Sequence, residues 1–121
     1  MSGTIDHSDP KRLVVAFAEA YTQWEEDMHF ARDEVAKTAL RDRHTQIFLD
    51  YCTNKKRAYV DGILSYSRPP TYSQICMDNI DHVEASGSSR MHVDTRHLNS
   101  HAYRFVLLKK KDGWRIDGVK W

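Results

Sequence analysis

The chain has 121 residues, of which 40% are hydrophobic, so it is long enough to fold as one domain around a buried core. Its 18 basic and 17 acidic residues give a formal net charge of +1, which excludes a strong overall attraction to nucleic acid or to a membrane surface. No segment approaches the roughly 18 consecutive apolar residues of a membrane span, and the first residues contain neither a basic start nor an apolar run. We therefore expect a single cytosolic domain over residues 1–121, with residues 1–8 flexible.

Two helices are predicted in the first half of the chain. The first begins at Asp9-Pro10, because aspartate caps a helix and proline is tolerated at the first helical position. Apolar residues then recur at three- and four-residue steps, which predicts one buried face of a long amphipathic helix. This face contains Leu13, Phe17, Ala20, Tyr21, Trp24, Met28 and Ala31. The second helical pattern ends near Thr53-Asn54 and contains Ala36, Leu40, Ile47, Phe48, Tyr51 and Cys52.

From Gly62 onward the spacing of apolar residues is typical of strands. Residues 63–67 form the first predicted strand, which ends before Pro69-Pro70 because proline cannot donate to a ladder. Residues 75–84 predict a second strand with a bulge, since their apolar positions depart from strict alternation. The glycine and serines of residues 86–89 predict a turn after it.

The end of the chain predicts three further antiparallel strands. Residues 90–96 alternate, so that Met91, Val93 and Thr95 face the core, and residues 98–100 form a turn. Residues 103–121 predict a hairpin whose first strand is apolar on both faces and therefore central in a sheet, with Asp112-Gly113 at its turn. Helices followed by a mainly antiparallel sheet define the α+β class.

The two cysteines, Cys52 and Cys76, do not have the spacing of a redox or metal motif. Each stands among apolar neighbours in the sequence, and cytosolic proteins rarely keep disulfides. We expect both to be buried, reduced thiols.

Three segments carry a resemblance to a known family: residues 17–28, FAEAYTQWEEDM; residues 44–59, HTQIFLDYCTNKKRAY; and residues 113–117, GWRID. They resemble nuclear-transport-factor-2-like domains and, more narrowly, the immunity proteins of that fold that bacteria encode beside polymorphic toxins. The resemblance implies a cone, in which N-terminal helices pack in a strongly curved, mainly antiparallel sheet. It also implies a protein that binds a cognate toxin and blocks it, with no cofactor and no chemistry of its own.

Two alternatives come from the wider superfamily. One is a small-molecule binder or an isomerase, dehydratase or hydrolase, whose acid-base groups inside the cone would be Asp81, His82, Tyr66 and His92. Residue types of this kind occur in any domain of this size, so the sequence favours a non-enzyme. The other alternative is a homodimer joined sheet to sheet.

Neither a metal site nor a nucleic-acid site is predicted. His92, His97 and His101 fall in a strand, at its end and after a turn, so their spacing does not require them to converge. The basic clusters at residues 55–57 and 109–111 lack interleaved aromatic residues for base stacking, which argues against direct nucleic-acid binding.

The first helix carries the predicted partner surface. Helical geometry places Glu19, Glu26 and Asp33 within about 40° of one another and nearly opposite the apolar face. Phe30 points to the same outer side if the helix persists that far. An acidic surface with an aromatic anchor suits a basic cleft on a toxin. The alternative is a solvated helix face, with Phe30 turned into the core.

A second predicted contact surface is the loop that contains Arg68 and Tyr72. The two prolines between them would hold both side chains at little entropic cost, and arginine and tyrosine are frequent interface anchors. The alternative is a structural connection whose tyrosine closes the core.

Overall fold

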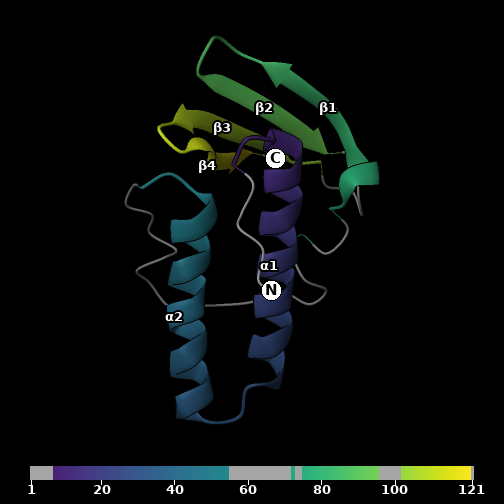
Figure 1. Ribbon diagram of the computed structural model, residues 1–121. Helices are drawn as coiled ribbons and strands as arrows, with labels where there is room; N and C mark the ends of the chain where they lie inside the picture. Colours follow the sequence, from purple (N-terminus) through teal and green to yellow (C-terminus); the bar gives the residue numbers. More distant parts are fainter. Residues whose placement is uncertain (1–6, 55–71, 73–74, 96–101, 121) are drawn as a thin grey trace.

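The computed structural model describes residues 7–54, 72, 75–95 and 102–120. Its elements are α1 (Pro10–Phe30), α2 (Glu34–Tyr51), the short 3-10 helix η1 (Met77–Asn79), β1 (Ile80–Ala85), β2 (Arg90–Thr95), β3 (Arg104–Lys110) and β4 (Gly113–Lys120). The two helices run antiparallel, and the sheet curves over one end of the pair (Figure 1). The turn between the helices lies at the opposite end, away from the sheet (Figure 1).

The four described strands form one antiparallel sheet in the order β1-β2-β3-β4. This meander is open and does not close into a barrel. Helices first and an antiparallel sheet afterwards confirm the predicted α+β class. The strand predicted at residues 63–67 and the turn at 98–100 lie outside the described residues.

Helix α1 begins where the sequence predicts. The Asp9 carboxylate accepts hydrogen bonds from the main-chain nitrogens of Lys11 at 3.1 Å and Arg12 at 3.4 Å, and Pro10 occupies the first helical position. The predicted apolar face is also confirmed: Leu13, Phe17 and Trp24 are buried, and the other members are partly buried against the core. Neither described helix is apolar enough along its length to cross a bilayer.

Phe17 is the centre of an aromatic core that joins the helices to the sheet. Its ring centroid lies 5.9 Å from that of Phe48 on α2 and 6.3 Å from that of Phe105 on β3, both in edge-on geometry. Edge-on aromatic pairs of this kind stabilise by about 0.5–1.5 kcal/mol beyond the area that they bury. The core is therefore built from side chains of α1, α2 and β3 that are remote in sequence.

Strand β3 confirms the prediction of a strand covered on both faces, since Phe105, Val106 and Leu107 are all buried. The hairpin turn follows at Lys111 and Asp112, and strand β4 begins at Gly113 with φ +117°, a conformation that favours glycine.

Two details differ from the prediction. Strand β1 begins at Ile80 rather than at residue 75, because the 3-10 helix η1 occupies Met77–Asn79. The predicted bulge is present, between Ile80 and His82. Both cysteines are free as expected, but only Cys52 is buried; Cys76 is exposed, since the strand predicted to bury it does not form there.

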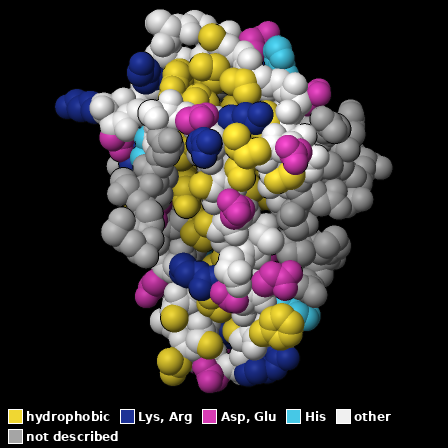
Figure 2. Space-filling model, turned by 45° about the vertical axis from the view of Figure 1, so that its right-hand side comes forward, with side chains coloured by type: hydrophobic (Ala, Val, Ile, Leu, Met, Phe, Trp, Pro, Cys, Tyr) yellow, Lys and Arg dark blue, Asp and Glu magenta, His cyan; other side chains and the backbone are white. Residues whose placement is uncertain are grey.

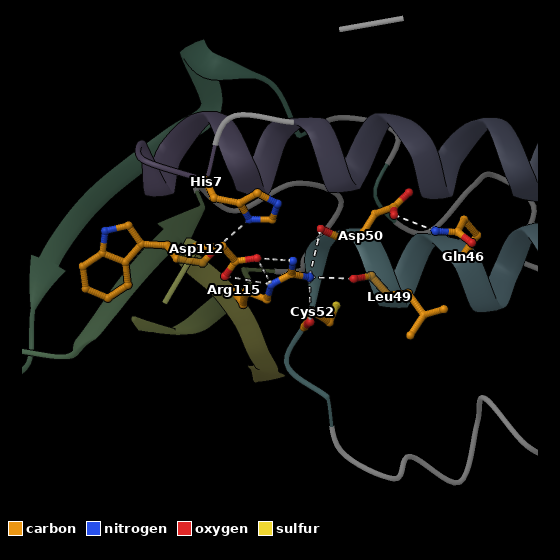
Figure 3. A network of polar contacts seen from close by, with 8 residues as sticks. His7, Gln46, Leu49, Asp50, Cys52, Asp112 and Arg115 are labelled. Atoms are coloured by element: carbon orange, nitrogen blue, oxygen red, sulfur yellow. Dashed lines mark hydrogen bonds and ion pairs between the residues drawn. The ribbon is translucent and has the colours of Figure 1, made fainter. Parts of the chain in front are cut away.

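The end of α2 is tied to the sheet by Arg115 of β4. The guanidinium donates to the main-chain carbonyl oxygens of Leu49 at 2.6 Å and Asp50 at 3.2 Å, and also pairs with the Asp112 carboxylate (Figure 3). A cation at this position satisfies carbonyls that have no partner within the helix and complements the helix dipole. Arg115 thus fixes α2 against the β3–β4 hairpin.

The start of the described chain is held at the same hairpin. The main-chain nitrogen of Trp114 donates to the His7 carbonyl oxygen at 2.7 Å, and the His7 ring Nδ1 lies 2.9 Å from the Trp114 carbonyl oxygen. His7 belongs to the segment that was expected to be flexible, and these bonds fix it against β4.

Candidate functional site

The acidic part of the predicted partner surface lies on α1. Glu19 is exposed, whereas Glu26, seven residues further along the helix, is half-buried. The negative charge of Glu19 reaches as far as Tyr51: burial of that phenol raises its pKa, and the carboxylates of Asp50 and Glu19 raise it further. Only Glu19 of the two predicted glutamates is thus fully open to a partner.

Phe30 is the last residue of α1, so the helix persists to the position that the outward orientation requires. Its side chain is 62% exposed, and the ring of His29 packs against it edge-on at 4.9 Å. The alternative in which Phe30 turns into the core is therefore wrong.

Asp33 does not extend the acidic face of α1, and this part of the prediction is wrong. The first helix ends at Phe30, and the Asp33 carboxylate caps α2 by accepting a hydrogen bond from the Ala36 main-chain nitrogen at 2.8 Å. Asp33 is a short polar residue that caps the next helix and therefore lies outside α1. Its seven-residue spacing from Glu26 does not place the two side chains on one helix face. Asp33 is nevertheless exposed, at the turn between the helices.

The second predicted surface is described only at Tyr72, since Arg68 lies outside the described residues. The Tyr72 ring is packed in the aromatic core, with centroids 5.4 Å from Tyr21, 5.3 Å from Tyr103 and 5.8 Å from Phe105. These contacts favour the structural alternative, in which this tyrosine closes the core. Its part in binding a partner stays a prediction.

Val35 was missed by the sequence reasoning. It lies in the first turn of α2 and is 82% exposed, the largest value among the exposed large hydrophobic residues of the described chain. The signal that could have found it is its position outside the Leu40, His44 and Ile47 face of α2, whose members are buried. Phe30 and Val35 stand on either side of the same turn.

Two buried polar residues were also missed. Glu25 and His44 are as buried as the apolar core. The Glu25 charge reaches the core phenol of Tyr103, whose pKa is raised first by burial and then by this carboxylate. Burial lowers the pKa of His44, which lies against the rings of Trp24 and Phe48. In a helical pattern, charged residues are assigned to the solvent side by default, so neither position was recognised.

The acid-base group that the enzyme alternative would need does not form among the described residues. Asp81 and His82 are exposed on β1, where the His82 ring lies 3.5 Å from the Glu84 carboxylate. His92 is on the face of β2 opposite the buried Val93, because neighbouring side chains of a strand alternate between faces. Tyr66 lies outside the described residues.

No group of three or more histidine, cysteine or acidic side chains comes together as a metal site in the described part of the chain. His97 and His101 lie outside that part, and the homodimer joined sheet to sheet stays a prediction.

The described elements define an α+β protein, in which two N-terminal helices lie beneath an open, antiparallel four-stranded sheet. The turn between the helices lies at the end remote from the sheet. The family model of the NTF2 fold immunity protein matches residues 9–121, which is nearly the whole chain. The chain therefore belongs to this family, as its helical segments and closing hairpin indicated. No curated protein and no solved structure matches it.

Proposed function

We propose that this protein binds a cognate bacterial toxin in the cytosol and neutralises it by occupying a surface that the toxin needs, without chemistry of its own. The observation that carries the proposal is membership of the immunity family over residues 9–121. Among the described residues, Asp81 and His82 are exposed on β1, so these positions add no support to the enzyme alternative.

The helix pair offers the surface for this contact. Residues 19–50 contain eight acidic and four basic side chains, a formal charge of −4 in a chain whose net charge is +1. A local field of this sign speeds encounter with a basic partner and depends on ionic strength. We assign the contact to Glu19, Glu26, Phe30 and Asp33, while the second surface with Arg68 and Tyr72 stays a prediction.

Protection in cells tests the role. The toxin domain encoded beside this chain is expressed in a bacterial host with and without the protein, and survival is measured. The proposal predicts survival only in the presence of the protein, and death in both cultures would refute the proposed function for that toxin.

Charge variants test the surface. The triple variant Glu19→Gln, Glu26→Gln, Asp33→Asn removes three negative charges, and asparagine still caps α2. We expect slower association and a weaker salt dependence than for the wild type. Glu84→Gln on β1 is the matched control, because it removes one exposed carboxylate on the sheet. Equal association rates for all three proteins would show that the acidic helix face is not the contact.

A further inference from the structure

The end of the molecule remote from the sheet carries an apolar pair. Phe30 is 62% exposed and Val35 is 82% exposed, whereas the other large exposed hydrophobics of the described chain are scattered. Leu49 lies near the opposite end of α2, Met77 in η1 and Val83 in β1. In Figure 2, hydrophobic side chains stand beside charged ones and a histidine at this remote end. We call residues 29–35, with both members of the pair, the hairpin tip.

The hairpin tip is ordered before any partner arrives. Asp33 caps α2 and so places Val35 in a regular first turn, while Phe30 is the last residue of the continuous helix α1. Between them, the Arg32 guanidinium donates to the main-chain carbonyl oxygens of His29 at 3.2 Å and Ala31 at 3.5 Å. A surface whose backbone is already fixed loses little conformational entropy on binding, so more of its contact energy becomes affinity.

Two interactions between α1 and α2 hold the helices together near the hairpin tip. The Trp24 indole nitrogen donates to the Leu40 carbonyl oxygen at 2.7 Å, and the Arg43 guanidinium pairs with the Asp27 carboxylate at 2.5 Å. Both start from the last seven residues of α1, the part of that helix nearest the turn, and they link it to α2.

The charges beside the pair indicate the chemistry of the partner. Asp33 and Glu34 are exposed and directly precede Val35, and they belong to the segment with a formal charge of −4. The Arg32 guanidinium donates to carbonyl oxygens of the turn, so some of its N–H groups already have acceptors. An apolar pocket with lysine or arginine at its rim would bury the pair and match these carboxylates.

We propose that the hairpin tip is the anchor that holds the toxin: Phe30 and Val35 enter an apolar pocket of the toxin whose rim is basic. This inference rests on the proposed function and names the part of the surface that limits dissociation. It moves the centre of the contact from the glutamates of α1 to the turn, where Val35 contributes as much as Phe30. Glu19 and Glu26 then steer the encounter.

The test uses the catalytically inactivated toxin domain of the neighbouring gene, immobilised, with the full-length protein in solution. The double variant Phe30→Ala, Val35→Ala removes the pair and keeps helix-forming residues at both positions. Leu49→Ala is the matched control, because Leu49 is a large hydrophobic residue of α2 that is 56% exposed near the other end of the helix. Thermal unfolding of each variant confirms that the fold is retained.

We expect the double variant to lose about 30-fold or more in affinity, mainly through faster dissociation. Leu49→Ala should stay within about threefold of the wild type, which is ordinary for a residue outside a hot spot. If the double variant unfolds at a lower temperature than the wild type, Val35→Thr, which keeps the shape of the side chain and makes it polar, supplies the same comparison.

The outcomes separate the two proposals. Absence of binding by the wild type, together with absence of protection in cells, refutes the proposed function itself. If the wild type, the double variant and Leu49→Ala bind with equal affinity, the hairpin tip is not the anchor, and the proposed function still stands. Loss of affinity in the double variant alone, with an unchanged unfolding temperature, supports the anchor.

Discussion

The indole nitrogen of Trp24 donates a hydrogen bond of 2.7 Å to the main-chain carbonyl oxygen of Leu40, inside the contact between α1 and α2. Trp24 is fully buried, so this N–H has no access to water and needs a partner. The bond joins the two helices close to the turn, since Trp24 lies six residues before the end of α1 and Leu40 six residues after the start of α2.

Replacement of Trp24 by phenylalanine should lower the free energy of unfolding by about 1–3 kcal/mol, because the buried hydrogen bond to Leu40 and part of the ring volume are lost. Urea denaturation measures the change. Trp114→Phe is the control, since Trp114 on β4 is only half-buried and its main-chain bonds to His7 survive the substitution. Equal losses in the two variants would show that the bond to Leu40 contributes nothing.

Arg115→Lys should destabilise the protein by about 1–2 kcal/mol, because a single ammonium cannot reach the carbonyl oxygens of α2 and the Asp112 carboxylate together. Arg104→Lys on β3 is the comparison, since Arg104 makes a two-point pair with Asp94 on the exposed face of the sheet. Exposed pairs of this kind contribute little to stability, because solvent screens them. A smaller loss in Arg115→Lys than in Arg104→Lys, by thermal or urea unfolding, would contradict the capping role.

His44 predicts a dependence of stability on pH. Burial lowers its pKa in the folded state, while in the unfolded chain the value is about 6.5. Between these two values the unfolded chain binds more protons, so the stability is complete above about pH 6.5 and falls as the pH drops toward the folded pKa. The free energy of unfolding of the wild type should therefore decrease between pH 7 and pH 5.

The variant His44→Leu should lose less stability over the same pH range, because it has no group to protonate in the aromatic core. His82→Gln is the control: His82 is exposed on β1, and its removal should leave the pH dependence of the wild type in place. Parallel curves for the wild type and His44→Leu would exclude His44 as the cause.

Two glycines of the described residues have a positive φ, and they should differ in their response to alanine. Gly87 has φ +97° and open space around a Cβ, so Gly87→Ala costs only backbone strain, about 1–2 kcal/mol. At Gly113 the φ is +117° and a Cβ would lie 2.5 Å from the His7 carbonyl oxygen. Gly113→Ala should therefore destabilise more, as measured by urea unfolding. Equal effects would show that the His7 segment moves aside freely.

Much of the fold could be predicted because its signals are local. The cap at Asp9, the apolar face of α1 and the closing hairpin depend on backbone geometry over a few residues, and all three are confirmed. The end of α1 is the instructive error. Periodicity continued through Asp33, but the capping bond to Ala36 ends one helix and starts another, and such a choice depends on where the second helix packs.

Only part of the candidate site could be predicted, because the rest depends on how the helices pack. Phe30 was placed on the outside from helical angles, and this holds. Val35 was missed because it lies outside the apolar pattern of the second helix, and its exposure depends on how the two helices pack. Glu25 was not recognised as a core residue, because only the assembled core buries it.

By itself the sequence determined the α+β class, the family resemblance, the inner face of α1 and the turn at Gly113, since each depends on residues close together in the chain. Only the tertiary structure decided that Arg115 caps α2, because the carbonyl oxygen that accepts its hydrogen bond belongs to Leu49, 66 positions away. It also decided that Phe30 and Val35 are both exposed, on either side of the turn at the end of the helices remote from the sheet. Contacts between distant segments depend on how whole helices and strands pack against one another, and the spacing of residues along the sequence does not reveal that packing.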